Sequence, residues 1–223
     1  QAGHRSIVAA CEGSQVTGEL ASFPHRDAPL DADAIAGARK ACRERVESVL
    51  AQRGVDLTHM HGVDFAACLP PFAPALVALH LPFDFYPAGS FGVERAGVSF
   101  HAVSTRQHAT APPGLALLPP ISNGVDADAF ARVERKSGYA LTLGRICAEK
   151  GTHLALDAAR TAGAPLVVAG RTFPYPDHAS YFHREVAPRL DRRRVFAGQV
   201  GGVRKQRLLA RARCLLDPSI AQE

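Results

Sequence analysis

The stretch "YALTLGRICAEKGTHLALDAA", residues 139–159, joins a short apolar run to an alanine-rich segment. Residues 139–143 are apolar almost throughout, which is typical of a parallel strand that is buried on both faces. Residues 152–161 have a helical pattern and end before Gly163, a favourable residue just beyond a helix C-terminus. A buried strand that leads directly into a helix is the building block of α/β proteins with parallel sheets.

The same order of strand and helix extends through the chain. Helices are predicted over residues 31–52, 152–161, 177–190 and 203–212. Further strands are predicted at HRSIVAAC (4–11), VDLTHMHG (55–62), PALVALHL (74–81), GVSFHAVS (97–104), GLALLPPI (114–121), APLVVAG (164–170), RRVFAGQV (193–200) and ARCLLDP (212–218). The repeated alternation predicts an α/β fold with parallel sheets.

A boundary between two α/β domains is predicted near residue 125. Residues 111–130 are rich in proline, glycine and asparagine and then turn into a short helix. We therefore expect one domain over residues 1–125 and a second over residues 126–223. The Asn123–Gly124 pair suits the turn at this boundary and Asp126 suits the start of the short helix, so both are interpreted as structural.

Composition indicates a globular protein with reduced cysteines. Of the 223 residues, 47% are hydrophobic and 21% are charged, which is enough apolar material for an ordinary core. No run approaches the roughly 18 apolar residues of a membrane span, and the first residues lack the layout of a signal peptide. The five cysteines are far apart, with no CxxC pair, so neither a disulfide framework nor a zinc knuckle is predicted. A cytoplasmic location is expected.

The excess of basic residues is mild, with a net charge of +5 and a pI of about 9.2. The densest basic run is RLDRRRV, residues 189–195, which is short and contains no aromatic residue for stacking on bases. The run is interpreted as ordinary solvated surface, and no nucleic-acid partner is predicted.

The turn that follows the strand at residues 139–143 carries two cations. Ligands of open parallel sheets bind beyond the carboxyl ends of the strands, where the next helix presents its N-terminus to an anion. Gly144 would let the backbone turn closely, Arg145 could grip phosphate oxygens with its planar fork, and Lys150 could add a compact charge. The pattern is neither a Walker A loop nor a GxGxxG fingerprint, so a charged surface loop stays open as the alternative.

An ordered set of segments resembles the family 4 retaining glycosyltransferases. The second half of the chain contributes ISNGVDADAF, LTLGRICAEKG, PLVVAG, VFAGQV and LLARARCLLDPSIAQE. The first half contributes GHRSIVAA, LTHMHG and PALVALHLPF. The resemblance spans nearly the whole chain and implies the GT-B type of fold, in which two Rossmann-like domains with parallel sheets face a cleft. Members of the family extend beyond both ends of this chain, so the resemblance implies that each domain is incomplete here.

The resemblance implies a donor site made by the second domain. Its ligand would be a nucleoside diphosphate sugar, whose diphosphate would lie at the turn after residues 139–143. The expected residues are Gly144, Arg145 and Lys150 for the diphosphate, and Gly170, Gly198 and Val200 in the vicinity of the nucleobase or donor.

Two residues are implied to act on the transferred sugar. Glu223 matches the first Glu of the family's Glu pair, and His80 matches the histidine that faces the donor sugar from the first domain. The second Glu of the pair, which binds ribose, has no counterpart in this chain. His59 and His61 would share one face of a strand, but no third ligand at suitable spacing is evident, so no metal site is predicted. His61 is assigned to the acceptor cleft instead.

The resemblance implies an enzyme, a bacterial glycosyltransferase that moves a sugar to an acceptor hydroxyl with retention of anomeric configuration. The acceptor stays open between a saccharide, a lipid and a small molecule, and peripheral contact with a membrane is left open with it. No cofactor and no metal is expected. Two alternatives remain, a sugar-nucleotide 2-epimerase of the same fold and a non-catalytic sugar-nucleotide-binding fragment.

Overall fold

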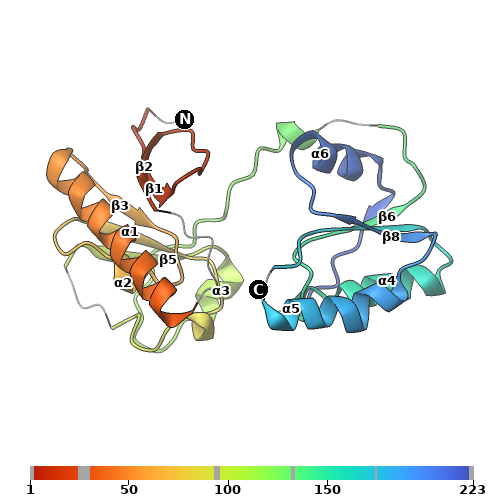
Figure 1. Cartoon of the computed structure of the whole chain (residues 1–223). Helices are drawn as coiled ribbons and strands as arrows, with labels where there is room; N and C mark the ends of the chain where they lie inside the picture. Colours follow the sequence, from red (N-terminus) through yellow and green to blue (C-terminus); the bar gives the residue numbers. More distant parts are fainter. Residues whose placement is uncertain (1–2, 25–30, 93–95, 132–133, 174, 221–223) are drawn as a thin grey trace. The chain divides into compact units, whose positions relative to one another are not determined.

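The chain folds into two compact units in a computed structural model. Unit 1 ends at Asn123 and unit 2 begins at Gly124; in Figure 1 they are coloured from red to green and from green to blue. The residues that the structure describes are 3–24, 31–92, 96–131, 134–173 and 175–220.

Unit 1 contains two small parallel sheets. Strand β1 (Ile7–Cys11) pairs with β2 (Glu19–Phe23), and their register places Ile7 opposite Glu19. The second sheet has the order β3-β4-β5, formed by Thr58–Met60, Ala75–Leu79 and Val98–Ala102. The middle strand is buried along most of its length, as expected for a strand covered on both faces.

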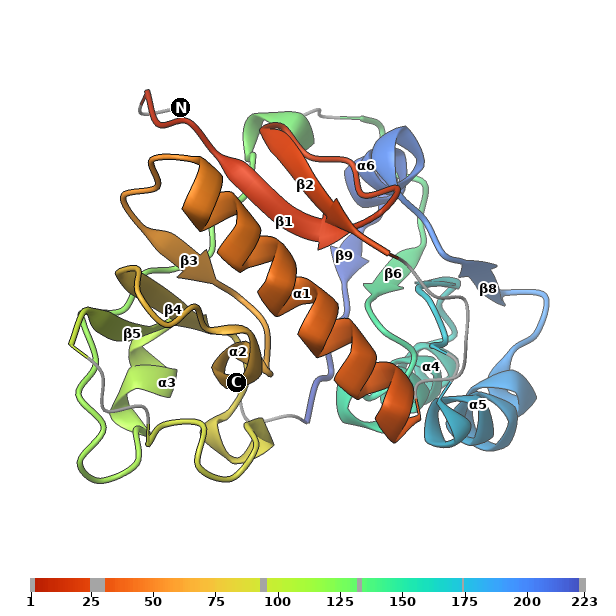
Figure 2. The same ribbon diagram turned by 60° about the vertical axis from the view of Figure 1, so that its left-hand side comes forward.

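A long helix, α1 (Ala32–Gln52), packs against strands β1 and β2 and against the short helix α2 (Phe65–Cys68), as Figure 2 shows. The side chain of Asp31 accepts a hydrogen bond from the backbone N–H of Ala34 at 2.8 Å, which is a standard N-cap. The guanidinium of Arg43 donates to the carbonyl oxygen of Ala67 at 2.8 Å and so joins α1 to α2. Two further short elements are η1 (Phe83–Phe85) and α3 (Thr105–Ala109).

Unit 2 is built on a four-stranded parallel sheet in the order β8-β7-β6-β9. The strands are β6 (Ala140–Leu143), β7 (Leu166–Ala169), β8 (Arg194–Gly198) and β9 (Cys214–Leu215). Every strand pair among the described residues is parallel in both units, so the predicted α/β class with parallel sheets is confirmed.

Helices cover both faces of the unit 2 sheet, with α4 and α5 on one side and α6 on the other (Figure 1). Successive residues of β6 point to opposite faces: Ala140 packs with Leu156 of α4, whereas Leu141 packs with Leu208 of α6. This burial on both faces is the reason that the strand sequence is apolar throughout rather than alternating. The helices are α4 (Thr152–Thr161), α5 (Pro176–Tyr181), continued by η4 (Phe182–Val186) and η5 (Ala187–Arg189), and α6 (Gly202–Arg211).

One predicted strand, at residues 114–121, is wrong. The segment runs beside β5, and Leu118 and Ile121 donate backbone hydrogen bonds to the carbonyl oxygens of Phe100 and Ala102, but only a single β-bridge forms. The two residues between these donors are prolines, which have no N–H with which to continue a ladder.

Two other features of the fold were not predicted. Strand β2 (Glu19–Phe23) is short and half exposed, so it has too few apolar residues for a clear strand pattern. The predicted helix over residues 177–190 changes from α-helical to π-helical and then to 3₁₀ geometry along its length. The short helix η2 (Asp128–Phe130) does follow the predicted cap, because the Asp126 side chain accepts from the N–H of Ala129 at 3.2 Å.

The ends of β6, β7 and β8 approach one another closely at three glycines, Gly144, Gly170 and Gly198. The N–H of Gly144 donates to the carbonyl oxygen of Ala169 at 3.1 Å, and the N–H of Gly170 donates to that of Gly198 at 2.9 Å. A Cβ atom added to Gly170 would overlap the carbonyl oxygen of Gly144, whereas one added to Gly144 would meet no atom within 4 Å. Position 170 therefore requires glycine for steric reasons.

We predict that Gly170→Ala lowers the free energy of unfolding of unit 2 by about 1–3 kcal/mol, the usual cost of overpacking. Gly144→Ala, on the other side of the same contact, is the control and should change stability much less. Urea unfolding followed by far-ultraviolet circular dichroism measures both, and equal stabilities of the two variants would contradict the assignment.

Candidate functional site

A shallow hollow lies at the carboxyl end of β6, where ligands of parallel α/β sheets bind. Its volume is about 10 Å³, which is room for about one water molecule, so it can accept a small group such as one phosphate oxygen. Its lining comes from β6, the following turn, the start of α4, the end of β7 and the segment after β9. The lining residues are Thr142, Leu143, Gly144, Arg145, Ile146, Lys150, Thr152, Ala169 and Asp217.

The turn that carries the two predicted cations is anchored at its middle. Ile146 is fully buried in the core, and its N–H donates to the carbonyl oxygen of Arg171 at 3.0 Å. Arg145, the residue before it, is exposed, while Lys150 is half-buried in the 3₁₀ turn η3 (Ala148–Lys150). The burial of Ile146 thus holds the exposed Arg145 at the rim of the hollow.

The segment after β9 packs onto this turn. The N–H of Ile220 donates to the carbonyl oxygen of Glu149 at 2.8 Å, and the ammonium of Lys150 lies 3.5 Å from the hydroxyl oxygen of Ser219. Gly151 has a φ of 60°, and a Cβ atom there would overlap the carbonyl oxygen of Pro218. The turn at 144–151 and residues 218–220, which both belong to the segments that carry the sequence resemblance, are therefore in direct contact.

The structure places the remaining donor-site predictions around the ends of β7 and β8. Gly170 and Gly198 lie together, joined by a backbone hydrogen bond, and Gly198 has a φ of 70°. Val200 packs against the apolar cluster beneath α6, so its side chain contributes to the core. Gly201 is the N-cap residue of α6. Glu223, the predicted sugar-contacting residue, lies outside the described residues.

In unit 1 the structure brings four histidines together at the carboxyl ends of β3, β4 and β5. Nδ1 of His61 lies 2.9 Å from Nε2 of His80, so one imidazole donates to the other. The ring of His59 is 4.1 Å from that of His61 and 6.0 Å from that of His101. His101 is 3% exposed, and its Nε2 has no hydrogen-bond partner among the described residues.

The sequence missed His101 as a neighbour of the HxH pair, although the register of the sheet explains it. His101 lies opposite Ala78 on β4, and His80 follows two residues after Ala78, on the same face. On β3, His59 lies opposite Leu76, so it shares this face as well. Residues that are far apart in the chain meet because three parallel strands end at one edge.

Burial and the proximity of the other rings lower the pKa values of two of these histidines. Burial lowers the pKa of His61 most, followed by the positive charge that His80 or His101 would carry. Burial likewise lowers the pKa of His59, and repulsion from His61, His101 and His80 adds to the effect. The cluster therefore favours neutral imidazoles, which can act as hydrogen-bond acceptors and as bases.

Arginines of the basic run at 189–195 are engaged with acidic side chains. Arg189 donates to the carboxylate of Asp157 at 3.0 Å and to that of Glu185 at 2.9 Å. Asp191 accepts from the backbone N–H of Arg193 and from the side chain of Arg194, and these contacts lower its pKa to about 2. Arg189 and Arg194 are thus paired with acidic side chains in the segment that leads into β8.

Comparison with known proteins adds one finding. No family model matches the chain, and no curated protein matches it. Among solved structures, AviGT4, a glycosyltransferase involved in avilamycin A biosynthesis, is similar with a TM-score of 0.58 and 22% sequence identity. The chain shares its fold with the matched part of AviGT4.

The similarity covers 97% of this chain and 56% of AviGT4, so the chain spans little more than half the length of that protein. At 22% identity the likeness is one of fold. Within the described ranges, no helix combines the length and apolar character needed to cross a membrane.

We predict that acidification destabilises unit 1. The pKa values of His59 and His61 are lowered in the folded state, so the unfolded chain binds protons more readily. These two histidines leave the free energy of unfolding at its full value above the ordinary histidine pKa of about 6.5. As the pH falls below that value, the unfolded chain takes up protons and this stability is lost. Unfolding followed by circular dichroism at a series of pH values measures the slope.

The matched variants are His59→Gln and His183→Gln. Removing His59 relieves repulsion within the cluster and should flatten the pH dependence of unit 1, whereas the exposed His183 in unit 2 should leave it unchanged. A slope that is the same in the wild type and in His59→Gln would show that the cluster does not control the pH response.

Proposed function

We propose that this chain belongs to a retaining glycosyltransferase of family 4, which transfers a sugar from a nucleoside diphosphate sugar to an acceptor hydroxyl. The observation that carries the proposal is the turn at 144–151 beside a hollow at the carboxyl end of β6, in a fold shared with a glycosyltransferase. The donor diphosphate would bind at this turn.

The chemistry of the turn suits a diphosphate leaving group. Cleavage of the anomeric bond leaves negative charge on the diphosphate, and preorganised positive charge lowers the energy of that transition state. Arg145 offers a planar fork for two phosphate oxygens and Lys150 a compact charge. Thr152, the first residue of α4, also lines the hollow, so the positive end of the helix dipole adds to the same field.

These groups belong to the protein itself, so the proposed reaction needs no metal or other cofactor to neutralise the leaving group. Gly170, Gly198 and Val200 would border the nucleobase side of the donor. The backbone contact between Gly170 and Gly198 supports this proposal because it leaves the strand ends without side chains that would obstruct a flat base.

The proposed roles in unit 1 are that His80 contacts the donor sugar and that His61 lies at the acceptor. Their mutual hydrogen bond supports a common role, because each imidazole fixes the orientation and tautomer of the other. Glu223 is proposed as the further group that contacts the transferred sugar. Retention requires the acceptor hydroxyl to attack from the face that the phosphate leaves, and the bacterial, cytoplasmic setting is part of the same proposal.

We predict that Arg145→Ala and Lys150→Ala each weaken the binding of nucleoside diphosphates by roughly 10- to 100-fold. A charge-assisted hydrogen bond contributes about 1.5–3 kcal/mol, and 1.4 kcal/mol corresponds to about 10-fold in affinity. Isothermal titration calorimetry with UDP, GDP, ADP and dTDP measures the effect, and inorganic pyrophosphate should compete.

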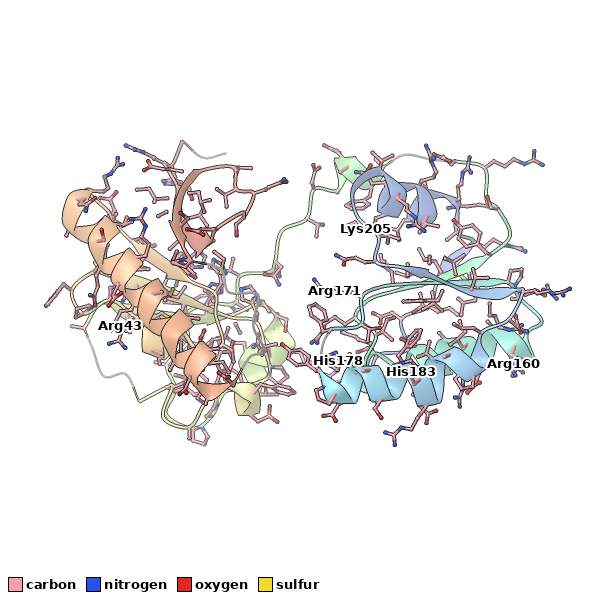
Figure 3. The ribbon with its side chains drawn as sticks, in the orientation of Figure 1. Arg43, Arg160, Arg171, His178, His183 and Lys205 are labelled. Carbon is pink, nitrogen blue, oxygen red and sulfur yellow. The ribbon has the colours of Figure 1, made fainter. Side chains whose placement is uncertain are left out.

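Lys205→Ala is the matched control for the loss of one positive charge. Lys205 lies on α6, where its ammonium is 5.4 Å from the centre of the Phe130 ring, and it does not line the hollow (Figure 3). Unchanged affinity in both Arg145→Ala and Lys150→Ala, or an equal loss in Lys205→Ala, would contradict a diphosphate site at this turn.

The reaction itself is tested with a panel of nucleotide sugars analysed by mass spectrometry. A transferase releases the nucleoside diphosphate, and nuclear magnetic resonance of the sugar product reports whether its anomeric configuration is retained. An isomerised donor without a glycoside would identify a 2-epimerase, and binding without any conversion would identify a non-catalytic fragment.

A further inference from the structure

Three potential metal ligands converge beside the turn at 144–151. Cys147, Glu149 and His178 each offer one ligand atom, and these atoms lie within 4.8 Å of one another. They form the only such group of three among the histidine, cysteine and acidic side chains that the structure describes. We propose that this group binds a transition-metal ion of the Zn²⁺ class and thereby ties the turn to α5.

Two of the ligands come from the turn itself. Cys147 directly precedes η3 and is 1% exposed, and its Sγ lies 3.9 Å from the carbonyl oxygen of Arg145. Glu149, two residues later, is exposed, so a bound ion would face solvent on one side. The buried position of Ile146 fixes the backbone from which both ligands project.

The third ligand is held in place from a separate element. His178 lies in α5, and its ring packs edge to face against Tyr175 at 5.2 Å and against Phe173 at 6.3 Å. Nδ1 of His178 is buried and makes no hydrogen bond to any described residue. A metal ion bound to the ring would replace the hydrogen bond to water that the buried histidine has lost.

The set of ligand types selects the metal class. Thiolate and imidazole bind Zn²⁺ well, whereas Mg²⁺ and Ca²⁺ require oxygen ligands. Three protein ligands leave the fourth tetrahedral position of Zn²⁺ to a water molecule. On binding, the Cys147 thiol releases its proton to solvent as the bond between sulfur and metal forms.

The ion would cross-link the turn that carries Arg145 and Lys150 to α5. Because the Cys147 thiol loses one proton on binding, the ion would add a net charge of +1 next to these cations, so that occupancy is expected to alter anion binding at the hollow. The metal site itself does not depend on the proposed sugar transfer, because its ligands are distinct from the residues proposed for the diphosphate.

The test is a titration of the whole 223-residue chain with Co²⁺, which replaces Zn²⁺ and reports thiolate ligands by absorbance. We expect a thiolate-to-cobalt charge-transfer band that saturates at about one equivalent and disappears when Zn²⁺ is added. Cys147→Ser should abolish the band. His178→Gln should weaken the binding by about 10-fold or more.

Matched controls exist for both variants. Cys214→Ser removes an exposed cysteine and His183→Gln an exposed histidine, and Figure 3 labels His183 along the same helical segment as His178. Both controls should bind Co²⁺ as the wild type does. Zn²⁺ should raise the midpoint of thermal unfolding in the wild type and in both controls, but not in His178→Gln.

Absence of the charge-transfer band in the wild type would overturn the proposal. So would a band that persists in folded Cys147→Ser, because another of the cysteines would then be the ligand. If Cys147→Ser does not fold, the comparison of His178→Gln with His183→Gln decides, and equal affinities of these two would overturn the proposal.

Discussion

The contact between Gly170 and the carbonyl oxygen of Gly144 is the constraint on which unit 2 depends. Because position 170 has no side chain, the ends of β6 and β7 can lie directly against each other. The carbonyl oxygen of Gly144 occupies the space that a Cβ atom at position 170 would need. The burial of Ile146 then fixes the turn that follows Gly144. Arg145 and Lys150 owe their position at the hollow to this backbone packing.

Both units gather their chemically active side chains by the same physical rule. Parallel strands end at a common edge, so residues that follow different strands become neighbours without being close in sequence. In unit 2 the rule brings Asp217, which follows β9, to the hollow beside the turn after β6, and in unit 1 it produces four clustered imidazoles. In unit 1, burial lowers the pKa of His59 and His61, and repulsion from the neighbouring histidines lowers it further, so their neutral forms are favoured.

Local sequence patterns predicted the α/β class and the strand, turn and helix around residues 139–161, because burial and capping leave clear marks there. The strand predicted at residues 114–121 was wrong. The segment is as apolar as a strand, but its prolines lack the N–H groups needed to complete a ladder. The roles of His101 and His178 could not be predicted, because strand register determines the neighbours of His101 and helix docking determines those of His178. Such long-range contacts leave no mark on any short stretch of sequence.

The packing of residues 217–220 on the turn also determines when that turn can form. Ser219 and Glu149 are hydrogen-bonded although they are 70 positions apart. A ribosome that adds about 5–20 residues per second needs several seconds to cover that distance. During synthesis, β6 and α4 can therefore assemble early. The turn between them can form its hydrogen bonds with Ser219 and Ile220 only later, once the segment after β9 has been made. The turn therefore completes its native contacts only after residues 218–220 have been synthesised.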